Sequence, residues 1–227
     1  MLPFVNSAGQ LVDQLTPVGT ILVANYPYVN AASTETTGFD VDLKSRFDAG
    51  GIGQFSGEVT WTHIETYQLT VNGVTYELAG THGPAGISGD TGNPKDRFTI
   101  RGSWDQGPLD ITASLNYIGH FSITDPSSGF PTCTEAVAYE GRFPGLTPST
   151  PTSFCTVSHF LETDLYGSYQ LVSNLQVHAS ILNLFNRQPP LDVQTYGGGS
   201  SFYPYDPALH QAGAVGRYFT IGATYQF

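Results

Sequence analysis

The last twelve residues, "GRYFTIGATYQF" (216–227), alternate between apolar and polar side chains up to the final position. The odd-numbered positions from Phe219 to Phe227 are apolar or aromatic, whereas the positions between them are polar or glycine. A period of two residues is typical of a β-strand with one apolar face. Soluble domains usually end in frayed or polar segments. A strand that ends on an aromatic residue therefore suggests that the end of the chain lies in an environment that favours apolar side chains.

The composition of the whole chain favours an all-β protein. Its 227 residues carry 19 acidic and 8 basic side chains, for a net charge of −11, and only 12% of residues are charged. Soluble domains average about 25% charged residues. Thr, Ser, Val, Tyr and Phe are common and helix formers are scarce, as expected for strands. The negative charge argues against nucleic-acid binding, because phosphates would be repelled.

Six further stretches show the same alternation. They are "FDVDLKSRF" (39–47), "GQFSGEVTWTHIETY" (53–67), "DRFTIRGSWDQG" (96–107), "LDITASLNYIGHF" (109–121), "FLETDLYGSYQL" (160–171) and "LQVHASILNLF" (175–185). With the terminal strand they predict seven strands, and "GTILVANYPYVN" (19–30) is either an eighth strand or the upper part of the next one. Residues 8–16 are the only stretch for which we also consider a short helix.

The connections between these strands alternate in length. Short turns at 48–53, 105–108 and 172–174 alternate with long connections at 71–94, 122–156 and 186–215. Short turns at one end and long loops at the other are the layout of an outer-membrane barrel, with short periplasmic turns and long extracellular loops. We therefore expect an antiparallel meander of seven or eight strands, forming an open, curved part of a transmembrane β-barrel.

Aromatic residues at both ends of the strands support this interpretation. Those near the short turns are Phe47, Phe55, Trp104, Tyr169, Tyr225 and Phe227, and those toward the long loops are Trp61, Phe98, Tyr117 and Phe219. Two such girdles match the headgroup levels of a membrane. The alternative is a water-soluble β-sandwich, whose two apolar faces pack on each other. Periodicity does not distinguish these cases, but the unequal connections and the terminal aromatic residue favour the barrel.

The N-terminal stretch "MLPFVNSAGQLVDQLTPVGTILVA" (1–24) does not have the features of a signal peptide. The first basic residue after the start is Lys44, so the positively charged segment that begins such a peptide is missing. An exported protein needs this information. We therefore expect either that the export signal is missing here or that the chain is a fragment.

Four stretches together resemble the C-terminal part of TonB-dependent outer-membrane receptors. They are "TETTGFDVDL" (34–43), "FTIRGSWDQGPLDITASLNYIGHF" (98–121), "ILNLFNRQPP" (181–190) and "GRYFTIGATYQF" (216–227). The resemblance covers roughly residues 20–227, and the last two stretches are the most specific. Asn186 stands where many members of the family have aspartate.

The resemblance implies a barrel of typically about 22 strands with a plugged lumen. Residues 1–227 would then be the C-terminal portion of the barrel domain, without the plug domain and without the N-terminal segment through which TonB is contacted. The implied function is active uptake of a scarce large nutrient: an iron–siderophore, cobalamin or an oligosaccharide. The implied location is the outer membrane of a Gram-negative bacterium, and the implied partners are membrane lipid, the barrel-assembly machinery and the rest of the receptor.

Two other classes of function stay open beside this one. The first is a self-contained small outer-membrane barrel or adhesin with seven or eight strands. The second is a soluble β-sandwich binding module. An open sheet would leave two long edge strands with unpaired backbone N–H and C=O groups, which a complete protein avoids. The polar face is also rich in Ser, Thr and Asn, which suits a wide lumen better than a narrow eight-stranded barrel.

The terminal strand also matches the family's recognition pattern for barrel assembly: polar, any, Gly, any, any, aromatic, any, aromatic. Thr220, Gly222, Tyr225 and Phe227 fill these positions in order. An unpaired strand of this kind can pair edge-on with a strand of an assembly machine. The alternative is that Tyr225 and Phe227 are girdle residues only.

No pattern in the sequence indicates catalysis or a metal site. The sequence has no nucleophile elbow, zincin or phosphate-loop motif, so we predict a protein that is not an enzyme. Its six histidines lack the spacing of metal ligands, and we expect no cofactor. Carboxylates on the polar face of the predicted strands are expected to meet water, a plug, or Lys and Arg neighbours.

The long loops hold two further candidate sites. In "TYGGGSSFYPYDP" (195–207), the rings of Tyr196, Phe202, Tyr203 and Tyr205 lie beside flexible glycines, and we predict that they bind sugars or planar chelates. The alternative is that they pack the loop against its neighbours.

Cys133 and Cys155 are the only cysteines and fall in one predicted loop. We expect a disulfide because cell-surface loops are in an oxidising environment. Two free thiols in a cytosolic chain are the alternative.

Overall fold

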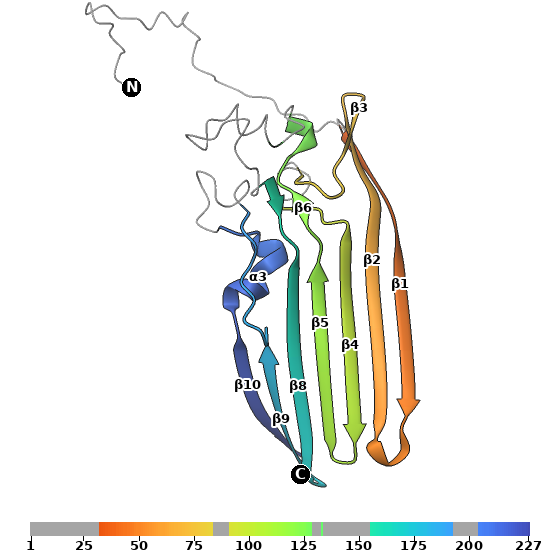
Figure 1. Ribbon diagram of the computed structural model, residues 1–227, viewed down its shortest axis with the longest axis vertical. Helices are drawn as coiled ribbons and strands as arrows, with labels where there is room; N and C mark the ends of the chain where they lie inside the picture. Colours follow the sequence, from red (N-terminus) through yellow and green to blue (C-terminus); the bar gives the residue numbers. More distant parts are fainter. Residues whose placement is uncertain (1–31, 84–90, 129–132, 134–154, 193–203) are drawn as a thin grey trace, which may run out of the picture. The chain divides into compact units, whose positions relative to one another are not determined.

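A computed structural model describes residues 32–83, 91–128, 133, 155–192 and 204–227. All of them belong to one compact unit, Ala32–Phe227, which is built on a single large antiparallel sheet (Figure 1). The sheet contains β1 (Ala32–Asp48), β2 (Gln54–Val71), β3 (Val74–Glu77), β4 (Asp96–Gln106), β5 (Leu109–Ile118), β8 (Phe160–Val172), β9 (Leu175–Leu182) and β10 (Tyr218–Tyr225). The other elements are η1 (Gly50–Ile52), β6 (Phe121–Ser122), η2 (Pro126–Ser128), β7 (Thr156–Val157) and α3 (Pro207–Val215).

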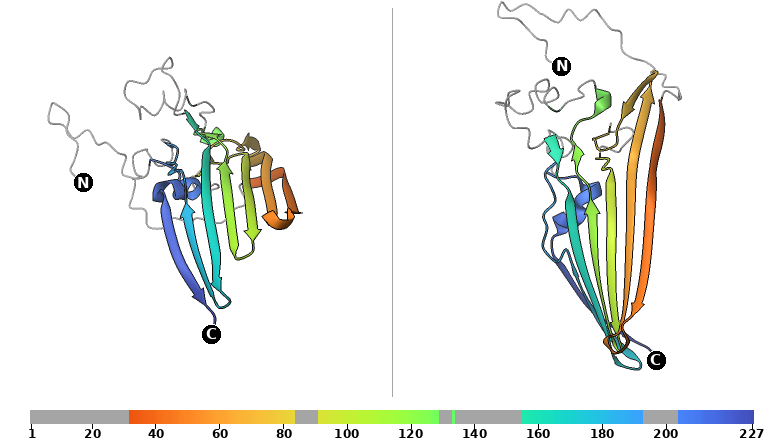
Figure 2. Two further views of the ribbon diagram at one scale, coloured as in Figure 1. Left: turned by 60° about the horizontal axis from the view of Figure 1, so that its bottom comes forward. Right: turned by 45° about the vertical axis from the view of Figure 1, so that its right-hand side comes forward.

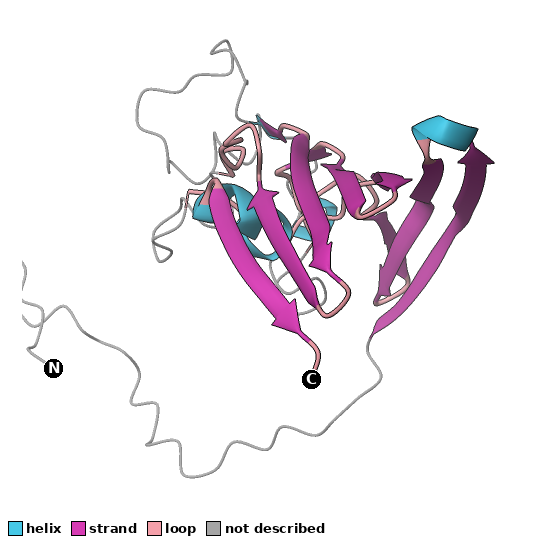
Figure 3. Cartoon of the chain, turned by 90° about the horizontal axis from the view of Figure 1, so that it is seen from below, coloured by secondary structure: helices cyan, strands magenta, loops and turns pink. Residues whose placement is uncertain are grey.

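Seven strands pair in the order in which they occur along the chain, β1-β2-β4-β5-β8-β9-β10, while the short β3 pairs with β2. This confirms the predicted meander of seven strands. Seen along the strands, the sheet is an open curve with β1 and β10 at its two free edges (Figure 3). The stretch considered as an eighth strand (19–30) and the one considered as a helix (8–16) lie outside the described residues.

The pairing register places the apolar residues of all seven strands on one face. Trp61 of β2 pairs with Val41 on one side and with Phe98 on the other, and Phe98 pairs in turn with Tyr117. Directly paired residues point to the same face of a sheet. The face defined in this way, here called the apolar face, contains Phe39, Val41, Leu43, Phe47, Phe55, Val59, Trp61, Phe98, Ile100, Trp104, Ile111, Ala113, Leu115, Tyr117, Leu161, Leu165, Tyr169, Val177, Ala179, Ile181, Phe219, Ile221, Ala223 and Tyr225.

The opposite side of the sheet, here called the polar face, carries hydroxyls, amides and charged groups. Its charged residues on the paired strands include Asp40, Asp42, Lys44, Arg46, Glu58, Arg97, Arg101, Asp105, Asp110, Glu162 and Asp164. The ammonium group of Lys44 lies 2.9 Å from a carboxylate oxygen of Glu58 and 3.4 Å from one of Asp42. The carboxylates of Glu58 and Asp42 thus meet a basic neighbour on this face, as the sequence suggested.

The short and long connections lie at opposite ends of the sheet, as predicted. The three short turns, 49–53, 107–108 and 173–174, lie together at one end, and β6, β7 and α3 lie toward the other (Figures 1 and 2). Glycine is required at Gly53 because its φ is +107° and a Cβ there would collide with the carbonyl of Asp105. The first turn can therefore fold back beside the second.

The sheet itself has little buried core. The apolar face is largely open, with Leu43 61% and Ile221 89% exposed. The only other sheet in the described residues is the two-residue pair β6–β7, so nothing there covers this face as the second layer of a sandwich would. The buried side chains gather instead at the long-loop end.

The sequence did not predict α3, the short hairpin β2–β3, or β6 and β7. Asp206 precedes α3, Pro207 begins it, and Gly216 follows it. This is a common sequence signature of a helix. The hairpin turns at Asn72–Gly73, where both residues have positive φ, as a two-residue Asn-Gly turn requires. No helix in the described part of the chain is long and apolar enough to span a membrane.

Candidate functional site at the long-loop end

The described parts of the three long connections form one packed assembly, here called the loop layer: residues 78–83, 91–95, 119–128, 155–159, 183–192 and 204–217. Phe121, Ile123 and Val157 form its apolar cluster, against which Cys133 and Leu209 pack. Buried polar residues also lie here, namely His82, Thr124, Asn183, Asp192, Asp206 and His210. Because all three connections contribute, the loop layer is the part of this chain best suited to present a fixed surface.

Asp206 joins two connections through one buried carboxylate. Its Oδ1 accepts hydrogen bonds from the backbone N–H groups of Ala208 and Leu209, at 2.9 and 3.2 Å, and so caps α3. Its Oδ2 accepts from the hydroxyl of Thr91 at 2.6 Å and from the N–H of Gly92 at 3.1 Å. Four donors satisfy a charge that would otherwise be costly to bury. The carboxylate therefore fastens residues 91–92 to the start of the helix.

α3 packs against the polar face of β8 through its smallest residue. A Cβ at Gly213 would come within 2.9 Å of the ring of Phe160 and 2.7 Å of the backbone nitrogen of Pro189. Phe160 precedes Glu162 and Asp164 in the alternation of β8 and shares their face. The helix and the 187–192 segment therefore approach the sheet closely on its polar side.

His210 is fully buried within this packing. Its ring stacks on Phe121 with a centroid separation of 6.4 Å and meets Phe160 edge-on at 5.5 Å. Neither ring nitrogen has a hydrogen-bond partner among the described residues. Burial lowers the pKa of His210, Asp206 opposes the shift and Arg97 adds to it, and the net result is a pKa of about 4. The imidazole is therefore neutral near pH 7 and serves as a flat, rigid ring.

A second buried pair, His82 and Asp192, links all three connections. Nε2 of His82 lies 3.7 Å from Oδ2 of Asp192, and both side chains are buried. The backbone N–H of His82 donates to the carbonyl of Thr124 at 2.9 Å, and that of Asp192 donates to the carbonyl of Pro204 at 2.9 Å. Residues from the first, second and third long connections are thus held together by a few hydrogen bonds.

The "ILNLFNR" segment (181–187) forms a turn that is locked by two asparagines. Asn183 and Asn186 have φ values of 49° and 51°, in the left-handed region that asparagine tolerates. Oδ1 of Asn183 accepts from the N–H of Arg187 at 2.7 Å, and its Nδ2 donates to the carbonyl of Arg187 at 2.9 Å. Oδ1 of Asn186 accepts from the N–H of Arg217 at 3.0 Å. Among the described residues the side chain of Asn186 makes this contact through its oxygen, which an aspartate, the residue that the family resemblance suggests here, would offer as well.

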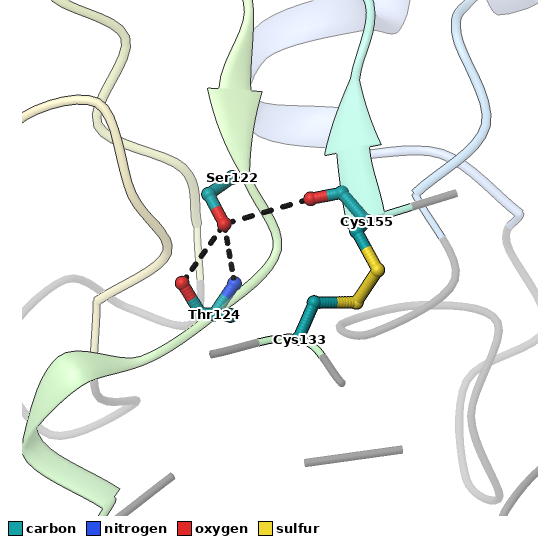
Figure 4. Close-up of a disulfide and its surroundings, with 4 residues drawn as sticks. All are labelled: Ser122, Thr124, Cys133 and Cys155. Carbon is teal, nitrogen blue, oxygen red and sulfur yellow. Dashed lines mark hydrogen bonds between the residues drawn. A yellow bond between two sulfur atoms is a disulfide. The ribbon is translucent and has the colours of Figure 1, made fainter. Parts of the chain in front are cut away.

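Cys133 and Cys155 are joined by a disulfide, with their Cα atoms 5.6 Å apart (Figure 4). The carbonyl of Cys155 accepts hydrogen bonds from the N–H of Ile123 at 3.1 Å and from the hydroxyl of Ser122 at 3.5 Å. The disulfide therefore lies beside the β6–β7 pair, at the base of the second long connection.

Of the four rings predicted to bind a ligand, only Tyr205 lies in the described part of the chain. It is half-buried and directly precedes Asp206, the capping residue of α3. Tyr196, Phe202 and Tyr203 lie outside the described residues, so the ligand-binding role of the four rings stays a prediction.

The predicted assembly signal lies at the free edge of the sheet. Thr220, Gly222 and Tyr225 belong to β10, and Phe227 follows it. The ring of Tyr225 meets that of Phe227 edge-on at a centroid distance of 5.0 Å. A Cβ at Gly222 would collide with the imidazole of His178, so a larger residue here would require that side chain to move. The assembly role stays a prediction.

The sequence did not point to Asp206, His210 or the His82–Asp192 pair as parts of the site. Asp206 could have been found from the Asp-Pro signal of a helix start. The burial of His82 and His210 follows from contacts between distant connections, for which a single sequence carries no signal.

Comparisons with known proteins place the chain in context. A family model described as TonB dependent receptor-like, beta-barrel, matches residues 6–184. No curated protein matches the sequence.

Solved structures similar to this chain include two mutants of the ferric enterobactin receptor PfeA from Pseudomonas aeruginosa. They are 16% and 15% identical over 85% of this chain, with TM-scores of 0.43 and 0.37. The closed form of the ferric-catecholate import receptor Fiu from E. coli is 13% identical over 93% of this chain, with a TM-score of 0.39. This chain spans between 22% and 31% of the length of these structures.

Proposed function

Because this chain belongs to the TonB-dependent receptor-like β-barrel family, we propose that its sheet is part of the wall of an outer-membrane barrel for active nutrient uptake. In this proposal the apolar face meets lipid, the polar face lines the lumen, and the loop layer faces the cell exterior. The rest of the barrel, the plug and the contact with TonB are supplied by other parts of a longer receptor.

The observation that carries this proposal is the uncovered apolar face. Its residues run across all seven paired strands, and burying each large apolar side chain is worth about 1.5–3 kcal/mol. Water would be a poor solvent for such a face, whereas hydrocarbon suits it. Aromatic pairs at both ends, such as Phe98–Tyr117 and Phe55–Trp104, fit the two headgroup levels.

The direction of the edge strands supports a larger barrel. β1 and β10 both run from the long-loop end to the short-turn end, because five strands in alternating directions lie between them. Pairing β1 with β10 would therefore be parallel, whereas bacterial barrels of this type are antiparallel with an even number of strands. The sheet thus needs an odd number of further strands, a condition that a barrel of about 22 strands meets.

The position of α3 favours a wide lumen over a small barrel. The helix packs on the polar face of β8 through Gly213 and Phe160. A helix with its side chains is about 10 Å across, whereas the interior of an eight-stranded barrel is just filled by the side chains of its own strands. For this reason we favour the large receptor over the self-contained barrel.

The proposed substrate class is a scarce large nutrient: an iron–siderophore, cobalamin or an oligosaccharide. We assign its recognition to the loop layer and to the aromatic residues that extend from it, of which Tyr205 is described. The acidic groups of the polar face line the path below. The proposal includes no catalytic residue.

Two adjacent residues of β2 test the proposal in intact cells that produce the full-length receptor. Val59 lies on the apolar face and Thr60 on the polar face. We expect the Thr60→Cys variant to react with a small hydrophilic maleimide. The Val59→Cys variant is expected to react only with an apolar, membrane-soluble maleimide. Equal reaction of the two positions with both reagents would contradict the barrel-wall assignment.

A further inference from the structure

The terminal strand β10 is held to the sheet from one side only. Among the described residues it pairs with β9 alone, at the edge of the sheet (Figure 3). A short turn fixes the register of a hairpin, but β9 and β10 are joined through residues 183–217. That connection is too long to set the register as a tight turn does. Side-chain pairing between β9 and β10 therefore has to set it.

The polar face of these strands carries one ring that fits between two small residues. His178 of β9 pairs with Ser168 of β8 on one side and with Gly222 of β10 on the other. A Cβ at Gly222 would meet the imidazole of His178, with Cε1 at 2.8 Å and Cδ2 at 3.3 Å. The ring of His178 thus occupies the space that a side chain at position 222 would fill.

The exposure of β10 agrees with this cover. Gly222 is the one residue of the strand that is partly buried, whereas the seven others are exposed. The ring of His178 is itself supported from β8, where Tyr166 stacks on it at a centroid distance of 6.4 Å. A glycine normally weakens a strand because it offers no side chain to pack. Here a ring from the neighbouring strand supplies that packing.

Other registers between β9 and β10 do not offer this fit. A shift by one residue would turn the apolar side chains of β10 toward the polar face. A shift by two residues would place His178 opposite Thr220 or Thr224, whose branched side chains would take the space of the ring. It would also break the hydrogen bond between the hydroxyls of Ser180 and Thr220. The observed register is therefore the one that accommodates the ring.

We propose that His178 and Gly222 form a register lock for the terminal strand, with His178 as its positioning residue. The lock fixes the height at which the outer edge of β10 offers its backbone N–H and C=O groups to the next strand. A barrel closes only with a fixed stagger between its strands, so a slip of two residues would misalign that closure. This last step rests on the proposed function, because the rest of the receptor supplies the closing strand.

The test reads the register by disulfide crosslinking in the full-length receptor. Val177→Cys with Ala223→Cys joins direct partners and reports the native register. Val177→Cys with Ile221→Cys and Ala179→Cys with Ala223→Cys report shifts by two residues in the two directions. Such diagonal positions lie about 7–8 Å apart in the native register, too far for a disulfide. We expect His178→Ala to raise the crosslinked fraction of the offset pairs by about fivefold, the scale of one cross-strand pair.

Three further variants make the test specific to the ring. His178→Phe keeps a flat ring over Gly222 and should retain the native register. Gly222→Ala displaces the ring and should raise the offset crosslinks, but it should add little in a protein that already carries His178→Ala. Gln176→Ala is the matched control, because Gln176 lies on the same face of β9 and pairs with Thr224; its crosslinks should equal those of the wild type.

Offset crosslinks at the wild-type level in both His178→Ala and Gly222→Ala would overturn the lock. If His178→Ala yields no folded receptor, the amount of the heat-modifiable folded band replaces the crosslink as the measurement. An equal loss of that band in His178→Phe would then overturn the proposal. A wild-type receptor found outside the outer membrane would contradict the proposed function, while its crosslinks would still test the lock, so the two failures are distinguishable.

Discussion

Asp206 shows how one buried side chain can hold a surface together. Its carboxylate receives two donors from the start of α3 and two from residues 91–92. The two partners are more than a hundred positions apart in sequence. If this carboxylate is lost, the first turn of the helix and the connection after β3 lose a shared anchor, while the sheet below keeps its own hydrogen bonds.

We therefore predict that Asp206→Ala loosens the loop layer selectively. Loss of the cap costs about 0.5–2 kcal/mol, and the buried donors left unsatisfied cost about 1–3 kcal/mol more. Hydrogen exchange of the full-length receptor should speed up in α3 and at Gly92, and stay unchanged in β4 and β5. Asp48→Ala is the control. Asp48 lies at the short-turn end of the sheet, where its carboxylate accepts a hydrogen bond from the nearby backbone N–H of Gly50. Equal protection of α3 in both variants would disprove the anchoring role.

His210 makes the loop layer sensitive to acid. The pKa of its buried ring is lowered to about 4, whereas an imidazole in an unfolded chain has a pKa of about 6.5. The unfolded state therefore takes up a proton first as the pH falls. The folded layer is expected to lose about 3 kcal/mol of stability between pH ~6.5 and pH ~4, and to gain it back as the pH rises.

His210→Phe keeps an aromatic ring between Phe121 and Phe160 but cannot take up a proton. We expect the free energy of opening α3, measured by hydrogen exchange, to depend less on pH in this variant than in the wild type. Above pH 7 the two proteins should differ little, because the imidazole is then neutral in both states. The same slope between pH 6.5 and 4 in both proteins would show that His210 does not cause the acid sensitivity.

At the scale of elements, the strands were the predictable part of the fold. Each has a complete alternation such as Leu109 to Tyr117, and the pairing register then follows from keeping one face apolar. Which strands lie at the edges of the sheet is harder to predict from sequence, because an edge strand has the same alternation as an inner strand. The lengths of β1 and β2 were underestimated because their upper ends, such as Thr34 to Thr37, lack an apolar face.

The loop layer was much harder to predict than the strands. Short elements such as β6 and β7 carry only two residues each and have no periodicity to detect. α3 and the β2–β3 hairpin did carry local signals, Asp206–Pro207 and Asn72–Gly73, which were overlooked within stretches that otherwise resemble loops. The contacts of His82, Asp192 and His210 arise from tertiary packing and have no counterpart in local sequence.

The disulfide belongs to the same scale, since it closes one long connection. Cys133 and Cys155 are 22 positions apart, and closing a loop of that length is worth about 3 kcal/mol in the chain-entropy model. We predict that the unreduced protein has no alkylatable thiol and a mass two hydrogens below that of the reduced form. Reduction should speed hydrogen exchange at Ile123 and Val157 but leave β9 unchanged. Two thiols that react without reduction would contradict this.

The terminal strand offers a prediction that separates two roles of its aromatic residues. If Tyr225 and Phe227 form an assembly signal, Tyr225→Ala with Phe227→Ala should strongly reduce the folded, heat-modifiable band in outer-membrane fractions. Phe47→Ala with Phe55→Ala is the matched control, because these paired rings lie at the same end of the apolar face but in β1 and β2, away from the terminal strand. Equal loss in the two double variants would reduce Tyr225 and Phe227 to girdle residues.

At the scale of the whole molecule, the sheet has the properties expected of one segment of a larger barrel wall. Its two edge strands run in the same direction, so it cannot close on itself by antiparallel pairing. Its apolar face suits hydrocarbon, yet an open edge there leaves N–H and C=O groups unpaired. Each unpaired group costs on the order of several kcal/mol in the bilayer. The longer wall supplied by other strands is therefore a physical requirement for this sheet in a membrane.

The final prediction follows from these edges: residues 1–227 alone do not transport a nutrient. When they are expressed behind an added signal peptide in a strain that lacks the relevant receptor, we expect aggregated or degraded protein and no growth on siderophore-bound iron or on an oligosaccharide. The same residues within a full-length receptor are the control and should give a folded band. Growth together with a folded outer-membrane monomer would contradict the prediction. It would favour the small barrel instead, with residues 19–30 as the eighth strand that makes an antiparallel closure possible.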